Sequence, residues 1–357
     1  MKQIQSSRLI CALLTLVMLG AFAGPAMAED GVEGEIPVLN IFTWELYIDY
    51  DTVIAPFELE TGIHVNYTNF TSNEEMLAKL DNVGGGEYDI VLASDYALDI
   101  LRGQGLLYKL DKALIPNFAN IDEGYQGQYF DPEDEYTVPY AAGTPLIVYD
   151  ERYVDVEITG YESLWDPALA DSIVVMDDAR NVIGITLKTL GQSFNVRDTA
   201  ILEQAKEKLL RLKPNIRALN YDTPHNLMIS GEATVGYMFT PQVIWAMSEN
   251  PNLKLVYPQE GLGFGIDGLV VPVNAPHPMN AHAFMDFVLR PEIGAAVFEV
   301  QNYLNCNKAA IPLLSDAYKD NPVLYVPAGL LQGAEYIEDV GDATPIYDEI
   351  WTAFKQE

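Results

Sequence analysis

Side chains able to hold a small ligand follow two predicted buried strands, residues 38–42 and 88–93. These side chains are aromatic, acidic or hydroxyl-bearing: Trp44, Glu45 and Tyr47 after the first strand, Ser94, Asp95 and Tyr96 after the second. In parallel α/β sheets, ligands bind beyond the carboxyl ends of the strands. The two clusters therefore predict a binding site at one edge of a sheet. For Trp44 alone, the alternative is that its ring closes the edge of the core.

Two aspartates further along the chain are additional candidates. Asp267 stands in the otherwise apolar and glycine-rich strand 263–272, where an unpaired carboxylate is costly. We therefore expect a functional role for Asp267. Asp178 precedes a predicted helix, and for a lone aspartate at this position the ordinary role is a helix cap.

Motifs for catalysis or metal binding are absent from the sequence. The four histidines do not stand with cysteine or acidic residues at metal-ligand spacing. The chain has no Gly-x-Ser-x-Gly motif, phosphate loop or dinucleotide-binding fingerprint. We therefore expect neither an enzyme nor a cofactor or metal site.

The elements that must position these residues alternate between strand and helix. Strands at 38–42, 63–67 and 88–93 are separated by helices at 51–60 and 72–82, a pattern that predicts a parallel sheet with helices on its faces. The same pattern recurs from residue 172 onward, and Thr344 is expected to cap a final helix. The length of the chain suits two α/β domains.

The first 28 residues predict export. Lys2 and Arg8 precede a short apolar stretch, residues 9–24, and Ala26-Met27-Ala28 completes a signal peptide. We expect cleavage after Ala28 and a soluble exported protein without an intrachain disulfide, because Cys306 is then the only cysteine. The mature chain has 52 acidic residues and 18 of the 20 basic ones, a net charge of −34. Such a surface repels nucleic acid.

Several segments together resemble the periplasmic spermidine/putrescine-binding proteins of ABC importers. The matching segments occur in family order over nearly the whole mature chain: TW-x-x-Y from Thr43, ETGIHVNY, SNEEMLAKL, YDIVLASDY, DDAR, GIDGLVVP, FVLRPE and DVGDATPIYDEI. The resemblance implies a two-lobed periplasmic-binding-protein fold, type II-like, with a mainly parallel sheet in each lobe and crossing strands between them. Lobe one would comprise residues 36–142 and 266–311, and lobe two residues 143–265 and 312–357.

The resemblance also implies a ligand, a polyamine held by aromatic rings and carboxylates. Ring faces attract ammonium groups and cover methylene groups, and carboxylates fix the positions of the nitrogens. The residues at the matching positions are Trp44, Tyr47, Ser94, Tyr96, Asp178, Asp267 and Tyr303. The expected partners are a polyamine or related small cationic solute and an inner-membrane ABC permease, and the protein is expected to be a monomer.

The sequence departs from the family pattern at several of these positions. Leu46 replaces an acid, which is shifted to Glu45, and Asn181 replaces a glutamate. Phe239 and Gly265 replace tryptophans, and Ile337 replaces a glutamine. We include Glu45, Asn181 and Phe239 among the predicted binding residues. The identity of the amine stays open, as do two alternatives: a periplasmic sensor that reports a polyamine to a membrane signalling enzyme, and a receptor for another small amine.

Overall fold

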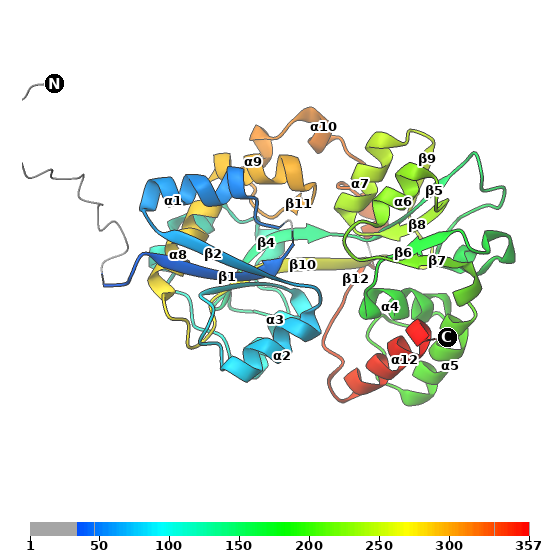
Figure 1. The fold of residues 1–357 in the computed structure, drawn as a ribbon, viewed down its shortest axis with the longest axis horizontal. Helices are drawn as coiled ribbons and strands as arrows, with labels where there is room; N and C mark the ends of the chain where they lie inside the picture. Colours follow the sequence, from blue (N-terminus) through cyan, green and yellow to red (C-terminus); the bar gives the residue numbers. More distant parts are fainter. Residues whose placement is uncertain (1–33, 46, 332, 357) are drawn as a thin grey trace, which may run out of the picture.

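The strands of the chain form two separate sheets, each flanked by helices (Figure 1). The computed structural model describes residues 34–45, 47–331 and 333–356. The predicted signal peptide, residues 1–28, and the departure at Leu46 lie outside this range.

The first sheet contains the strands that carry the N-terminal predicted clusters. Its order is β11-β4-β10-β3-β1-β2, with β12 paired to β10. The bounds are β1 Val38–Trp44, β2 His64–Phe70, β3 Ile90–Ser94, β4 Thr137–Gly143, β10 Gly263–Val270, β11 Leu304–Asn305 and β12 Glu335–Tyr336. Residues 90–93 of β3 are completely buried, as expected for an apolar strand covered on both faces.

The second sheet lies to the right of the first in Figure 1. Its order is β7-β6-β8-β5-β9. The bounds are β5 Leu146–Asp150, β6 Ile173–Val175, β7 Ile216–Leu219, β8 Val235–Met238 and β9 Leu253–Val256.

Helices cover both sheets. Those beside the first sheet are α1 Ala55–Thr61, α2 Asn73–Val83, α3 Asp95–Gly103, α8 Pro278–Val288 and α9 Pro291–Gln301. Those beside the second are α4 Ala179–Thr189, α5 Thr199–Leu210, α6 Pro224–Ser230, α7 Thr240–Glu249 and α12 Thr344–Gln356. Two short helices, α10 Asp316–Lys319 and α11 Ala328–Leu331, occur in the last connection. Among the described residues, none of the helices is long and apolar enough to cross a membrane.

The α/β prediction is confirmed, with one correction to strand direction. Strands β1, β2 and β3 run parallel, but β10 runs antiparallel to both β3 and β4. In the second sheet, β5 is antiparallel to β8 and β9. Both sheets are therefore mixed rather than mainly parallel. Strands β10 and β5 follow connections between the two halves; β10 runs antiparallel to β3 and β4, and β5 runs antiparallel to β8 and β9.

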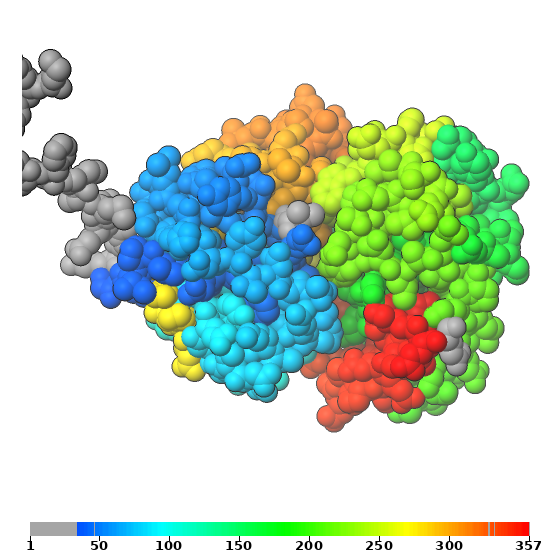
Figure 2. Space-filling model, viewed as in Figure 1, coloured from blue at the N-terminus to red at the C-terminus, as the bar shows by residue number. Residues whose placement is uncertain are grey.

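The two halves are joined where β4 leads into β5 and where β9 leads into β10. Only Thr144 and Pro145 separate β4 from β5. In Figure 1, β4 and β10 run side by side from the first sheet toward the second. The chain returns to the second half after α10, since Tyr318 still hydrogen-bonds to Tyr303 and Asn305 beside the first sheet. The space-filling view shows the two halves in close contact along their shared border (Figure 2).

Local sequence signals mark the end of α1 and the start of α2. The Gly62 backbone is left-handed, with φ 70°, and ends α1 as predicted. Ser72 caps α2 by accepting from the Glu75 amide at 3.1 Å. Thr344 is different from the prediction: its backbone is already α-helical, so it is the first residue of α12 rather than its cap.

Candidate functional site

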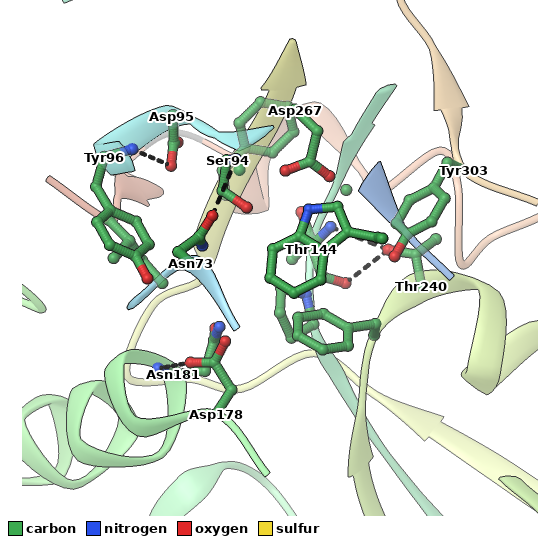
Figure 3. A pocket seen from close by; sticks show the side chains of 18 of the residues that line it. Asn73, Ser94, Asp95, Tyr96, Thr144, Asp178, Asn181, Thr240, Asp267 and Tyr303 are labelled. Carbon is green, nitrogen blue, oxygen red and sulfur yellow. Dashed lines mark hydrogen bonds between the residues drawn. The ribbon is translucent and has the colours of Figure 1, made fainter. Parts of the chain in front are cut away.

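A cavity lies between the two sheets and receives side chains from both (Figure 3). It encloses about 690 Å³ of empty space, counted with its opening to solvent. The lining includes carboxylates, amides, hydroxyls and a set of aromatic rings. The first half contributes Trp44, Tyr47, Asn73, Ser94, Asp95, Tyr96, Asp267 and Tyr303, and the second half contributes Thr144, Asp178, Asn181, Tyr221, Phe239 and Thr240.

Asp267 is held at the first-sheet side of this cavity. Strand β10 places it opposite Ser94 on β3 and Ala141 on β4. One carboxylate oxygen accepts a hydrogen bond from the Tyr47 hydroxyl at 2.5 Å. Burial raises the pKa of the Asp267 carboxyl, and the hydroxyls of Tyr47 and Ser94 counter part of this shift. A cation beside Asp267 would restore the ionised form.

Aromatic rings from both halves line the cavity. The Trp44 indole stacks on Tyr221 with ring centroids 5.5 Å apart and an interplanar angle of 22°. Tyr221 in turn meets the edge of Phe239 at 5.7 Å. On the other side, the rings of Tyr47 and Tyr303 are 4.9 Å apart. Such faces can cover methylene groups and attract cations at ~0.5–2 kcal/mol each.

A second carboxylate, Asp178, faces the cavity from the second half. It caps α4 by accepting from the Asn181 amide at 2.8 Å, as predicted. Burial raises the pKa of Asp178 to about 6 despite this hydrogen bond. The amide oxygen of Asn181 is buried and lacks a hydrogen-bond partner among the described residues. Asp178 thus has a capping role and still presents an acceptor to the cavity.

Tyr96 lies at the start of α3, on the same side of the cavity as Ser94 (Figure 3). Its hydroxyl donates to Glu74 of α2 at 3.0 Å. The Arg180 guanidinium lies 5.4 Å from the Tyr96 ring centroid. Tyr96 is therefore fixed from both halves and lines the cavity with its ring.

The structure brings together all the predicted site residues except Glu45. Glu45 is exposed and lines two neighbouring cavities, one of which shares Trp44 and Tyr221 with the central cavity, but not the central cavity itself. Sequence reasoning missed several cavity-lining residues: Asn73 and Thr240, which begin α2 and α7, Phe264 in β10, and Thr144 and Tyr221, which follow β4 and β7. Tyr221 follows the carboxyl end of β7, so the same rule of strand ends would have found it.

The arrangement suits binding of an organic cation. Acidic groups stand on opposite sides of a cavity whose remaining walls are largely aromatic. The described residues contain no group of three or more metal-binding side chains. Burial of carboxylates without a paired charge is costly, which a bound cation would relieve.

Two α/β halves with a ligand-sized cavity between them define a solute-binding protein. The chain belongs to the family of bacterial extracellular solute-binding proteins, whose family model matches residues 52–325. It is 36% identical over 341 residues to the spermidine/putrescine-binding periplasmic protein of Salmonella typhimurium, covering 95% of this chain and 97% of that one. The Escherichia coli protein of the same name is 35% identical over 318 residues, covering 89% and 91%.

Solved structures show the same fold. The spermidine/putrescine ABC transporter substrate-binding protein PotD of Streptococcus pneumoniae is 33% identical and has a TM-score of 0.75, with 89% of this chain and 98% of that chain covered. A solved structure from Listeria monocytogenes is 34% identical with a TM-score of 0.86, covering 90% and 99%. The predicted family and the two-sheet architecture are thereby confirmed.

Proposed function

We propose that this protein binds a polyamine in the cavity between its two halves and delivers it to an inner-membrane ABC permease. The observation that carries the proposal is Asp267, a buried carboxylate hydrogen-bonded to Tyr47 and surrounded by aromatic rings. The names of the relatives from Salmonella typhimurium and Escherichia coli support the ligand class. Those names also support a periplasmic location and a binding rather than a catalytic role.

A diamine or triamine fits the chemistry of this cavity. One ammonium group would pair with Asp267, and a second would approach Asp178 from the opposite side (Figure 3). The rings of Trp44, Tyr221 and Phe239 would cover the methylene groups between the two nitrogens. The ligand thus needs positive charges at two points and an alkyl chain between them.

The two halves would act as hinged lobes. We propose the lobes expected from the sequence, 36–142 with 266–311 and 143–265 with 312–357, with one change: the last crossing lies between Tyr318 and Val323 and not at residues 311–312. The hydrogen bonds of Tyr318 beside the first sheet and the burial of Val323 in the apolar cluster of the second sheet support this change. Because ligand contacts come from both lobes, binding should favour a closed arrangement.

A thermal-shift screen of the mature protein tests the function. The panel contains putrescine, cadaverine, spermidine, spermine, agmatine and neutral amino acids. At least one polyamine should raise the melting temperature at micromolar concentration, since a ligand that binds only the folded state stabilises it. Stabilisation by amino acids and by none of the amines would refute the proposal.

A further inference from the structure

Asp95 is a second carboxylate on the same side of the cavity as Asp267. It is the first residue of α3, directly after β3, and its side chain is 2% exposed. Asp267 pairs with Ser94 in the antiparallel register of β10 and β3. Asp95 directly follows Ser94 in the chain and so lies next to this pair. Both aspartates line the cavity, and Figure 3 shows them above and beside Ser94.

One oxygen of the Asp95 carboxylate makes no hydrogen bond to the described residues, although the Ile266 backbone amide lies close enough to lower the pKa of the carboxyl. Its Oδ1 atom accepts from the Tyr96 amide at 2.9 Å, which accounts for a structural role at the start of α3. Its Oδ2 atom is buried and has no hydrogen-bond partner among the described residues. A buried carboxylate oxygen left unpaired costs free energy. The hydrogen bond at the start of α3 therefore compensates the burial of only one of the two carboxylate oxygens.

Arg180 is the cationic side chain within electrostatic reach of Asp95, but it makes its side-chain hydrogen bond elsewhere, and its buried Nε atom has no hydrogen-bond partner among the described residues. The Arg180 guanidinium donates to Asn195 at 3.1 Å and stacks 4.9 Å from the Tyr347 ring centroid. The ion pairs found within the described ranges do not include one between Arg180 and Asp95. The unpaired oxygen of Asp95 is thus left for a ligand.

Space for a cationic group exists beside these aspartates. A Cβ atom added at Gly265 of β10 would have no heavy atom within 4 Å, so the cavity is open there. By contrast, one added at its pairing partner Gly143 would lie 2.8 Å from the Thr240 hydroxyl oxygen. Gly265 thus leaves room in the cavity, whose lining also includes Phe264 and Ile337.

We propose that Asp95 is a second ligand-binding carboxylate, which with Asp267 binds one terminal cationic group that carries at least two N–H donors. A primary ammonium and a guanidinium both satisfy this requirement, because each can donate to two separate carboxylates. A quaternary ammonium cannot. The inference rests on the proposed function and specifies how one end of the ligand is recognised.

Release of a proton on ligand binding would report that the Asp95 carboxylate takes part in binding. Burial, and then the charge of Asp267, raise the pKa of Asp95 well above its ordinary value, and the backbone amides of Tyr96 and Ile266, followed by Arg180, counter only part of the shift. The hydroxyls of Tyr129 and Tyr336 also lie within its electrostatic reach. Binding of a cation between the two aspartates should therefore expel a proton into the buffer.

The test is calorimetric titration of the mature protein and two variants with putrescine and agmatine. Asp95→Asn keeps the oxygen that accepts from Tyr96 and removes the charge. Asp99→Asn is the matched control, because it removes the same charge from the same helix at a residue paired with Arg102 outside the cavity. Titrations in two buffers of different ionisation enthalpy give the number of protons released.

The proposal predicts that Asp95→Asn weakens binding of the better of the two ligands, putrescine or agmatine, by ~10- to 100-fold and reduces proton release. The Asp99→Asn variant should stay within about twofold of the parent, and melting temperatures should not fall. A larger loss for agmatine identifies a guanidinium between the aspartates, and a larger loss for putrescine identifies an ammonium. Asp95→Ser, which also retains an acceptor at the helix start, should show the same loss.

Two results would overturn the inference. In the first, the parent binds an amine and Asp95→Asn binds it equally well with unchanged proton release. In the second, Asp95→Asn and Arg180→Gln each weaken all ligands alike and the double variant is no weaker, so that Asp95 acts through Arg180. A parent protein that binds none of the amines would instead refute the proposed function, so the two failures are distinguishable.

Discussion

Replacement of Asp267 by asparagine removes the charge at the centre of the proposed site and preserves its shape. The asparagine oxygen can still accept from the Tyr47 hydroxyl, which donates to Asp267 at 2.5 Å. Removing one partner of a buried charge pair costs ~2–5 kcal/mol of binding free energy. At 1.4 kcal/mol per factor of ten, amine affinity should fall by ~30- to 4,000-fold.

The stability of the empty protein should change in the opposite direction. Burial raises the pKa of Asp267 above its value in the unfolded chain. The folded protein is therefore favoured where the carboxyl is protonated and loses stability as the pH rises through the raised pKa. The amide side chain of the Asp267→Asn variant does not ionise, so the melting temperature of the empty variant at pH 7 should equal or exceed that of the parent.

Calorimetric titration and thermal unfolding of the same two preparations decide the matter. The reasoning holds if affinity falls and the melting temperature does not. It is refuted if the Asp267→Asn protein binds the amine as tightly as the parent while its melting temperature collapses, because Asp267 would then serve the fold.

Four further outcomes follow from the site. Since the pKa of Asp178 is about 6, amine affinity should fall by up to ~tenfold per pH unit below pH 6, and Asp178→Asn should flatten this dependence in titrations at pH 5 and 7. The folded protein binds the Asp178 proton more tightly than the unfolded chain does, so the melting temperature of the empty parent should fall as the pH rises from ~4 to about 6. Trp44→Ala removes the ring stacked on Tyr221 and should weaken amine binding by ~2- to 30-fold in calorimetry. Glu45→Gln should leave the affinity within about twofold, because Glu45 is exposed outside the central cavity; a larger loss would place the ligand nearer the rim.

The sequence predicts the N-terminal elements well because their signals are local. An unbroken apolar run marks β3, and the left-handed Gly62 ends α1. Strand direction cannot be predicted in this way, because an apolar run has the same pattern whether the strand is parallel or antiparallel to its neighbour. The antiparallel placement of β10 depends on how the chain returns from the second sheet, which no local pattern records.

Some residues of the binding site can be predicted from local sequence, whereas others are placed there only by tertiary packing. Trp44 and Ser94 could be predicted because they stand at the ends of buried strands. Tyr221 follows β7, an edge strand whose residues are half-buried or exposed and carry a weak pattern. Glu45 directly follows Trp44, the last residue of β1, but does not line the central cavity, since neighbouring residues at a strand end point in different directions. Such orientations depend on packing between the two halves.

A crystal structure of the protein with the most stabilising amine from the thermal-shift screen tests the central claim most directly. The account predicts one ligand nitrogen within hydrogen-bonding distance of the Asp267 carboxylate and its methylene groups against Trp44 and Tyr221. An amine bound elsewhere on the molecule, or one whose nitrogens avoid Asp267, would contradict it.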